Sequence, residues 1–306
     1  MEQRYFVGVD GGGTKTALIA CTPEGTEVAL AVCGPLNYNF IGIEAALHNL
    51  GAGIAALNLP EGSIAAVGIG DPSIDDESES PAAKEFAKRA AELLGAPVYI
   101  RSDAYMTLFA LTGGQKAGVL IISGTGSMAI GENADREIFV AGGWGRLTGD
   151  EGSGYYIGLE GIRAALRAAD GVALQTDLTS AALKHFDVST PRDLIPVFYG
   201  EREPDVAGFS RGVAACAANG DGIAREILLD AAAHLARYAL VLLDRCQAHL
   251  VGVWGSVLCK NDTVRRAFED AVHEKLPQVE IREPAISAEL AAALYAVQQE
   301  KERDAK

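Results

Sequence analysis

Two glycine- and threonine-rich turns, each following a short apolar strand, most constrain what this 306-residue chain can fold into. The first turn, Asp10–Thr16, lies between the apolar runs Tyr5–Val9 and Ala17–Cys21. The second turn, Ser123–Ser127, follows the apolar run Val119–Ile122 and leads into another short strand. Because the strand–turn–strand plan occurs in both halves, the sequence predicts an α/β protein with two domains built on one plan.

The first turn is predicted to bind phosphate groups. Backbone amides in a glycine-rich turn can donate to phosphate oxygens, because no side chain blocks their approach. A P-loop would carry Lys and Ser or Thr directly after its second glycine, and both a P-loop and a dinucleotide-binding turn would continue into a helix. Here Thr14 separates Gly13 from Lys15, and the run Ala17–Cys21 is a short strand. A phosphate-binding β-hairpin with Asp10 at its mouth is the interpretation that remains.

The remaining apolar patterns complete a mixed α/β chain with two predicted domains. Residues 1–112, completed by a C-terminal helix at Ala288–Lys306, form the first domain, and residues 113–287 form the second. The charged end of that helix, Glu300–Lys306, is expected to be frayed and solvated. Residues 155–250 are expected to be mostly helical. Further strands are predicted at Val28–Val32, Ile64–Ile69, Val98–Ile100 and Leu250–Trp254, and helices at Glu44–Leu57 and Pro81–Leu94.

Charge and cysteine content exclude several functional classes. The formal net charge is −15, so the surface repels phosphate backbones and anionic membranes, and no nucleic-acid or membrane partner is expected. No apolar run is long enough for a signal peptide or a membrane span. The five cysteines are far apart, which argues against a zinc site or a disulfide framework. Reduced thiols and a cytoplasmic location fit best.

Four polar residues in the first half are candidates for chemistry. Asp10 can hold Mg²⁺, directly or through water, or can simply form the turn. Asp103 follows a predicted strand, where the residues alone leave a helix cap and a general base equally open. Asn37 lies in a polar loop, where an ordinary turn role is the alternative to ligand binding. Asp71 can contact Mg²⁺ or a sugar, but a turn-capping role is favoured.

In the second half, one aromatic residue and one acidic pair are candidates. Trp144 lies among glycines, which is unusual for a core tryptophan and favours a stacking surface for a sugar ring. Asp150 and Glu151 are adjacent acids before a helix, and they could act only on the helix N-terminus.

Five short motifs along the chain together resemble one family. They are Asp10–Thr16 (DGGGTKT), Ser102–Ala104 (SDA), Ser123–Ser127 (SGTGS), Gly142–Gly145 (GGWG) and Gly149–Ser153 (GDEGS). The combination resembles the N-acetylglucosamine kinase branch of the BadF/BadG/BcrA/BcrD-type ATPase family, within the actin/hexokinase/Hsp70-like superfamily. This resemblance covers nearly the whole chain. It implies a two-domain actin-like ATPase (ribonuclease H-like) fold with duplicated mixed β-sheet domains and an interdomain cleft.

The resemblance also implies a role for individual residues. Asp103 matches the family's catalytic base, and Asp10 the position near Mg²⁺. Asn37 matches the sugar-binding asparagine better than Asn39 does, and the first acid of the adjacent pair, Asp150, holds sugar hydroxyls. The full sugar-binding set is Asn37, Asp103, Gly143, Trp144 and Asp150, and the ATP- and phosphate-binding set is Gly12, Gly13, Thr14, Lys15, Gly124, Thr125, Gly126, Gly255 and Ser256.

The implied activity is ATP-dependent phosphorylation of an amino sugar, with Mg²⁺ as cofactor and ATP as co-substrate. N-acetylglucosamine, converted to its 6-phosphate, is the expected substrate, and glucosamine or N-acetylmuramic acid are alternatives. A different class is also open, an ATP-driven activator of a radical dehydratase, which would need cysteines to hold an iron–sulfur cluster. None of the cysteines has glycine-rich surroundings of that kind. Relatives of this family are commonly dimers, so a homodimer is expected.

Overall fold

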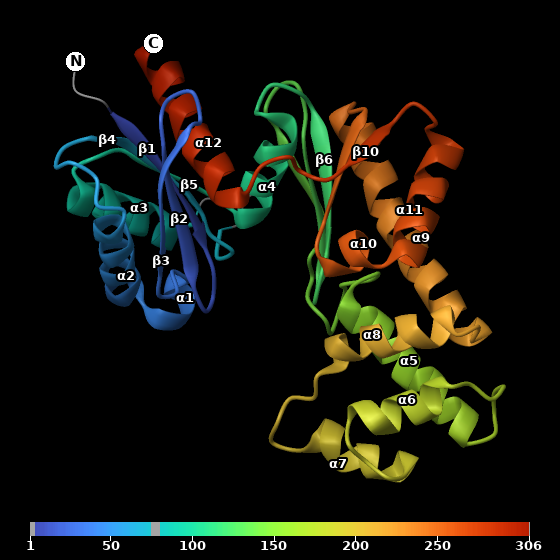
Figure 1. The fold of residues 1–306 in the computed structure, drawn as a ribbon. Helices are drawn as coiled ribbons and strands as arrows, with labels where there is room; N and C mark the ends of the chain where they lie inside the picture. The colour runs from blue at the N-terminus through green and yellow to red at the C-terminus, as the bar shows by residue number, and fades with distance from the viewer. Residues whose placement is uncertain (1–3, 75–79, 306) are drawn as a thin grey trace. The chain divides into compact units, whose positions relative to one another are not determined.

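The computed structural model describes residues 4–74 and 80–305 and divides into two units. The first unit comprises Met1–Lys116 together with Pro284–Lys306, and the second comprises Ala117–Glu283. Each unit contains one five-stranded mixed sheet, drawn in Figure 1.

In the first unit, helices cover both faces of the sheet. Its strands run in the order β3-β2-β1-β4-β5, where β1, β2 and β3 pair antiparallel, and β4 and β5 run parallel to β1. Helices α2 and α3 pack on one face, and α12 packs on the other across β1 and β4 (Figure 1). The elements are β1 (Tyr5–Gly11), β2 (Thr16–Cys21), β3 (Glu27–Cys33), α1 (Tyr38–Ile41), α2 (Ile43–Ala56), β4 (Ile64–Gly70), α3 (Pro81–Leu94), β5 (Val98–Arg101), α4 (Asp103–Thr112) and α12 (Ala288–Asp304).

Two glycines allow α12 to lie directly on the sheet. A Cβ atom at Gly8 in β1 would lie 1.8 Å from the carbonyl oxygen of Glu289, and one at Gly68 in β4 would lie 1.9 Å from that of Ala292. No side chain fits at such distances, so the helix approaches the strands only because both residues are glycines.

The edge strand β3 carries a row of exposed apolar side chains, the β3 ladder. Val28, Leu30 and Val32 are 45%, 66% and 67% exposed, although the alternate residues Ala29 and Ala31 pack against the core under α2. An edge strand has unpaired backbone groups, and natural proteins usually protect such strands with charges or proline. Between Val28 and Cys33 this strand has neither.

The second unit has the same antiparallel and parallel pairing in a sheet of order β10-β9-β6-β7-β8. Strand β6 pairs antiparallel with β7 and parallel with β9. The elements are β6 (Gly118–Ser123), β7 (Ser127–Glu132), β8 (Ile138–Gly142), α5 (Gly154–Ala169), α6 (Leu178–His185), α7 (Leu194–Tyr199), α8 (Val206–Ala218), α9 (Gly222–Cys246), β9 (Leu250–Trp254), α10 (Ser256–Lys260), α11 (Asp262–Lys275) and β10 (Glu280–Arg282).

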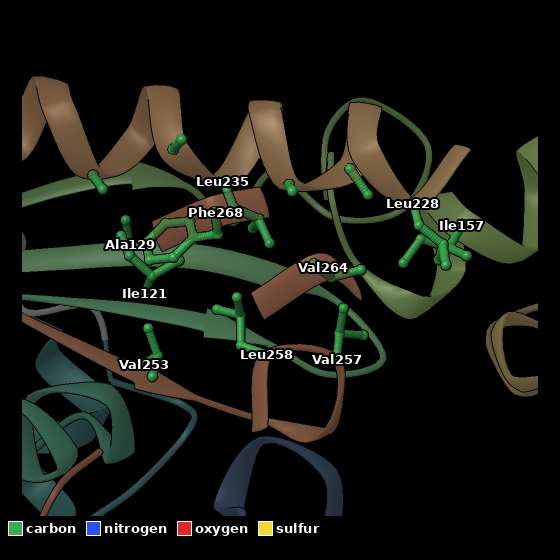
Figure 2. Close-up of a cluster of buried hydrophobic side chains, with 14 of the residues drawn as sticks. Ile121, Ala129, Ile157, Leu228, Leu235, Val253, Val257, Leu258, Val264 and Phe268 are labelled. Carbon is green, nitrogen blue, oxygen red and sulfur yellow. The ribbon is translucent and has the colours of Figure 1, made fainter. Parts of the chain in front are cut away.

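The core of the second unit lies between its sheet and the helices α9 and α11. Figure 2 shows Phe268 of α11 next to Ile121 and Ala129 of the sheet, with Leu235 of α9 above them. Burying a large side chain of this kind contributes about 1.5–3 kcal/mol to stability. This packing therefore fixes the ends of β6 and β9, which carry candidate binding residues.

Two strands and one helix end differ from the sequence analysis. Strands β8 and β10 were not predicted. The expectation of a solvated end from Glu300 onward is wrong for Glu300, which is buried and accepts a hydrogen bond from the Tyr99 hydroxyl at 2.6 Å. Arg303 also pairs with Glu300 at 2.6 Å, so these two partners hold the last turns of α12 in place. Lys306 lies outside the described residues.

None of the helices within residues 4–74 and 80–305 combines the length and the apolar character that crossing a bilayer requires. The longest, α9, has 25 residues.

Candidate active site

Three carboxylates of the first unit lie at the carboxyl ends of adjacent parallel strands. Asp10 pairs with Gly70 across β1 and β4, and Gly70 pairs with Arg101 across β4 and β5. Asp71 follows β4 directly, and Asp103 begins α4 just after β5. In open α/β sheets, ligands bind outside the carboxyl ends of the strands, so this is the expected place for a site.

Of these three acids, Asp10 has the pKa that departs most from its ordinary value. Burial, together with the smaller effects of the charges of Glu289 and Asp103, raises the pKa of Asp10 to about 6. A carboxylate destabilised in this way gains from a nearby cation. Among the described residues, no three His, Cys, Asp or Glu side chains form a ready-made metal site. A divalent cation at Asp10 would therefore take most of its ligands from water or from a bound molecule.

Asp103 is not the cap of its helix, so one alternative role left open by the sequence is wrong. The N-cap of α4 is Ser102, whose hydroxyl accepts a hydrogen bond from the Tyr105 N–H at 2.8 Å. Asp103 is the first residue of the helix, and its Oδ1 accepts from the Ala104 N–H at 2.8 Å. Burial raises the pKa of Asp103, although the Ala104 N–H opposes that shift. A partly buried carboxylate with increased proton affinity is a suitable general base.

Asn37 is the N-cap of the short helix α1 in the same unit. Its Oδ1 accepts from the Asn39 N–H at 3.2 Å, and the side chain is only 8% exposed. Asn37 therefore has the turn role that the sequence left open, and its amide oxygen makes the hydrogen bond of that turn.

The first glycine-rich turn joins β1 to β2 and is exposed at its tip. A Cβ at Gly12 would lie 2.4 Å from the Lys15 carbonyl oxygen, so the turn itself requires this glycine. At Gly13 a Cβ would meet no atom within 4 Å, and the backbone is not left-handed. The fold itself therefore does not require glycine at this position. The close approach of a ligand to the backbone would explain it. Thr14 and Lys15 are exposed beside it.

The second glycine-rich turn joins β6 to β7 and lies against the start of α5. Gly154 donates its N–H to the Gly124 carbonyl at 2.7 Å, and the Ser123 hydroxyl donates to the Gly152 carbonyl at 2.8 Å. A Cβ at Gly124 would meet nothing within 4 Å, as at Gly13. Both turns thus contain one glycine that the fold does not require.

Asp150 lies beside this second turn in a conformation that favours glycine. Its φ is +61°, and a Cβ at Gly126 would lie 2.9 Å from its Oδ2. A non-glycine residue in the left-handed region is often found at a functional site. Glu151, by contrast, accepts a 2.6 Å hydrogen bond from the Tyr238 hydroxyl, which lowers the pKa of Glu151. The two adjacent acids therefore have different surroundings.

Trp144 is exposed in the loop after β8. The indole is 76% exposed, and the flanking Gly143 and Gly145 have φ of +73° and +79°. Gly143 donates its N–H to the Ser127 carbonyl at 3.1 Å, which anchors the loop beside the second turn. Trp144 is thus not a core residue, as a stacking surface requires.

A polar cavity of about 440 Å³ in the second unit contains predicted nucleotide-binding residues. Gly124, Thr125 and Ser256 line it. The turn before Ser256 needs Gly255, because a Cβ there would lie 2.4 Å from the Ser123 carbonyl oxygen. Sequence reasoning missed the other polar residues of the cavity. The missed residues include Asp205, Ser210 and Arg211 at the start of α8, and Lys260 and Asn261 after Ser256.

The structure thus places the predicted residues in two groups. The first unit holds Asp10, Asn37 and Asp103 with the first turn, and the second unit holds the second turn with Asp150, Trp144 and the cavity. The sequence pattern hardly distinguishes Arg211 and Lys260 as binding residues, because each is a single basic residue in a helix. Only the fold brings them next to Gly124.

Comparisons with known proteins agree with this architecture. The family model for the BadF/BadG/BcrA/BcrD ATPase family matches residues 7–296. An N-acetyl-D-glucosamine kinase from Dictyostelium discoideum is 29% identical, over 98% of this chain and 100% of that protein. An N-acetylmuramic acid/N-acetylglucosamine kinase from Clostridium acetobutylicum is 32% identical, over 76% of this chain and 77% of its own length.

One solved structure extends the similarity to the fold. A crystal structure from Chromobacterium violaceum, provisionally assigned as an N-acetylglucosamine kinase, matches with a TM-score of 0.70 and 26% identity. The match covers 95% of this chain and 99% of that one. The expected fold class, two α/β domains of the actin-like ATPase type, is confirmed.

Proposed function

The chain belongs to the BadF/BadG/BcrA/BcrD ATPase family, and from this membership we propose that it is an ATP-dependent kinase that phosphorylates an amino sugar. N-acetylglucosamine, converted to N-acetylglucosamine 6-phosphate, is the proposed substrate, since the names of both relatives include it. The observation that carries the proposal is Asp103. It is a partly buried carboxylate with a raised pKa at a strand end, and it is not needed to cap α4, because Ser102 caps that helix.

In the proposed reaction, Asp103 takes the proton of the sugar hydroxyl as the phosphoryl group is transferred. Its Oδ1 is held by the Ala104 N–H, so Oδ2 is the proposed proton acceptor. Phosphoryl transfer needs little covalent chemistry from a protein beyond such a base, positioning and charge neutralisation. The side chains of Asn37, Trp144 and Asp150, with the backbone of Gly143, are proposed to bind and orient the sugar.

The two glycine-rich turns are proposed to bind the phosphates of ATP. Gly12, Gly13, Thr14 and Lys15 form the first turn, and Gly124, Thr125 and Gly126 form the second. The open space at Gly13 and Gly124 supports this role, because backbone amides there can approach phosphate oxygens closely.

The cavity beside the second turn is proposed to bind the rest of the nucleotide. Ser256, which follows the proposed nucleotide-binding residue Gly255, lines one side of it, and Arg211 and Lys260 supply positive charge. A volume of about 440 Å³ lies within the usual range for small-molecule sites.

Asp10 is proposed to hold Mg²⁺, directly or through water. When bound, the ion would neutralise charge that develops on the transferring phosphoryl group. The raised pKa of Asp10 supports this role, because the carboxylate stands among other negative groups that a cation would offset.

No observation favours the radical-dehydratase activator. Cluster ligands are thiolates, and burial raises the pKa of all five cysteines. All five are free thiols, and three of them are buried. N-acetylmuramic acid and glucosamine remain alternative substrates of the proposed kinase.

A homodimer and a cytoplasmic location are also part of the proposal. The exposed ladder on β3 supports pairing with a second copy. In an antiparallel pair centred on Leu30, Val28 of one copy lies opposite Val32 of the other, and all the apolar side chains share one face. Free thiols and the use of ATP fit the cytoplasm.

The test of the proposed function is a panel of amino sugars assayed for ADP release with Mg²⁺ and ATP. N-acetylglucosamine is expected to give the highest kcat/KM, with a 6-phosphate product identified by NMR. ATP hydrolysis that no sugar accelerates would contradict the proposal and favour a regulatory ATPase.

A further inference from the structure

The turn after β4 contains a buried carboxylate oxygen that the turn does not use. Asp71 is fully buried. Its Oδ1 accepts from the Ser73 N–H at 2.7 Å, and its backbone N–H donates to the Arg101 carbonyl at 3.0 Å. A serine or asparagine side chain could cap the same turn, so capping alone does not explain a carboxylate at this position.

Three polar atoms of this region have no hydrogen-bond partner among the described residues. They are the Asp71 Oδ2, the Tyr38 hydroxyl and the Ser73 Oγ, and all three are buried. A fourth such atom is Thr16 Oγ1 in β2. A buried polar group without a partner destabilises the folded state, and native proteins pair nearly all such groups with protein or ordered water. The group of three thus indicates a shared partner.

Asp71 lies close to both segments of the first unit that are proposed to bind the sugar. A Cβ at Gly70, the residue before Asp71, would lie 3.5 Å from the Asp103 Cα. A Cβ at Gly11 would lie 2.9 Å from the Gly70 carbonyl oxygen and 3.2 Å from the Leu36 side chain. Leu36 is followed directly by Asn37 and Tyr38.

The electrostatics agree with this placement. Burial, and then the charge of Asp71, raises the pKa of Tyr38 to about 12. Burial raises the pKa of Asp71, hydrogen bonding from Ser73 opposes this shift, and the charge of Asp103 adds to it. The Tyr38 ring is held in place by packing on Phe86 of α3, with centroids 5.1 Å apart.

We propose that an ordered water bridges the Asp71 Oδ2 and the Tyr38 hydroxyl, with Ser73 as a third partner, and that Asp71 is thereby a positioning residue for the sugar acceptor. A buried water typically has about three polar partners, which these atoms supply. The bridge holds the Asn37 loop at a fixed distance from the strand end that carries Asp103. This inference rests on the proposed function, in which Asn37 and Asp103 contact one sugar.

Loss of the bridge affects the sugar more than the nucleotide. A shift of the Asn37 loop weakens its hydrogen bond to the sugar and misplaces the hydroxyl relative to Asp103. The nucleotide cavity lies wholly within the second unit, so it is not disturbed. A purely structural defect would not separate the two substrates in this way.

The test compares Asp71→Ser, Tyr38→Phe and the double variant. Serine keeps a turn-capping oxygen and removes Oδ2, and phenylalanine removes only the hydroxyl. Each single variant is expected to raise the KM for N-acetylglucosamine about tenfold, the value of one hydrogen bond. The KM for ATP stays within about twofold of the parent. The double variant is expected to resemble the singles, because both changes remove one bridge.

Tyr99→Phe is the matched control. It removes a different hydroxyl of the first unit, which donates a hydrogen bond to Glu300 of α12. This variant is expected to lose thermal stability and to keep the parent's sugar KM. The proposal is overturned if the Asp71→Ser sugar KM stays within about twofold of the parent, if the ATP KM rises in parallel, or if the two single effects multiply in the double variant. A parent chain that phosphorylates no sugar would refute the proposed function instead.

Discussion

At the scale of single residues, burial of part or all of the side chain is the common condition of the three acids at the strand ends of the first unit. Burial is the largest cause of the raised pKa of Asp10, Asp71 and Asp103. Removing a carboxylate from water disfavours its charged form. These residues therefore lower the stability of the protein at neutral pH, which is a common property of catalytic sites.

The role of Asp103 predicts separate effects on turnover and on stability. Asp103→Asn is expected to lower kcat by about 10²–10⁴-fold, the usual contribution of a general base. The melting temperature should not fall, because the Ser102 hydroxyl caps α4 in both proteins and the substitution removes a charge that burial disfavours. Steady-state kinetics at saturating amino sugar and thermal melting measure the two effects.

Ser102→Ala is the control for that pair of measurements. Loss of the N-cap hydroxyl is expected to lower the free energy of unfolding by about 1 kcal/mol. Its kcat should remain much closer to that of the parent. An Asp103→Asn variant that turns over within a few-fold of the parent would remove Asp103 from the mechanism.

Asp10 predicts a pH-dependent gain in stability when it is replaced. Its pKa is about 6 in the folded protein and about 3.9 in an unfolded chain. The folded state therefore binds this proton more tightly, and stability falls as pH rises from about 4 through 6, by about 3 kcal/mol in total. Asp10→Asn removes this loss, so it is expected to be more stable than the parent at neutral pH but inactive.

Urea unfolding of the parent and of Asp10→Asn at several pH values measures this difference. The gap should close as pH falls toward about 4, where Asp10 is protonated in both states. A gap that is the same at every pH would show that the ionised carboxylate is not the cause.

Sequence patterns identify these residues as candidates for chemistry, but they do not predict the surroundings of each one. Asp10, Asp103 and Asp150 stand out because each lies in a short motif of glycine or small residues at a strand or helix end. The burial of Asp71 could not be predicted, since it depends on packing of the turn after β4 among residues distant in the chain. The same holds for Ser102, whose capping role depends on where α4 begins.

At the scale of elements, the contact of α12 with β1 and β4 depends on two glycines. Substituting Gly68 by alanine would place a Cβ against the Ala292 carbonyl oxygen. Because backbone rather than a flexible side chain would have to move, the loss of stability is expected at the upper end of overpacking effects, about 3 kcal/mol. The midpoint of urea unfolding measures it.

Gly51→Ala is the matched control for this change. Gly51 lies within α2, where a Cβ would be 3.6 Å from Leu93, an ordinary contact. Alanine there is expected to raise stability by up to about 1 kcal/mol, because glycine weakens a helix. Equal effects of the two substitutions would contradict close packing of α12 on β4.

The elements that the sequence missed are short or have unusual partners. Strand β10 has three residues, Glu280–Arg282, and only its middle residue is partly buried, so no alternating pattern exists to detect. The end of α12 is charged in sequence, but Glu300 is buried because Tyr99 and Arg303 supply its partners. Patterns of apolar residues do not reveal a buried acid whose partner lies 201 positions away.

At the scale of the whole molecule, the β3 ladder predicts assembly through one identifiable surface. The parent chain is expected to elute at twice its 32.0 kDa mass in size-exclusion chromatography with light scattering. Leu30→Lys places a charge at the centre of the proposed pair, and it is expected to yield monomers that remain folded. Burying Leu30 in the pair contributes about 1.5–3 kcal/mol per copy, so losing this contribution from both copies should be enough to separate them.

Val241→Lys is the control for this prediction. Val241 is also an exposed apolar residue, at 47%, but it lies on α9 in the second unit. This variant should keep the mass of the parent. A parent that is monomeric at every concentration, or a Leu30→Lys variant that still dimerises, would exclude β3 as the interface.

The first unit is discontinuous in the chain, and this has a consequence for biosynthesis. A ribosome makes β1 to β5 before the second unit, and it makes α12 only after the second unit. Domains tend to fold as they emerge, but the sheet face that buries Phe6, Ile19 and Ala66 stays uncovered until α12 leaves the exit tunnel. The second unit can thus complete its core on the ribosome, whereas the first depends on α12, which is made only after the whole second unit. During that interval its apolar face is the part of the nascent chain most suited to bind a chaperone.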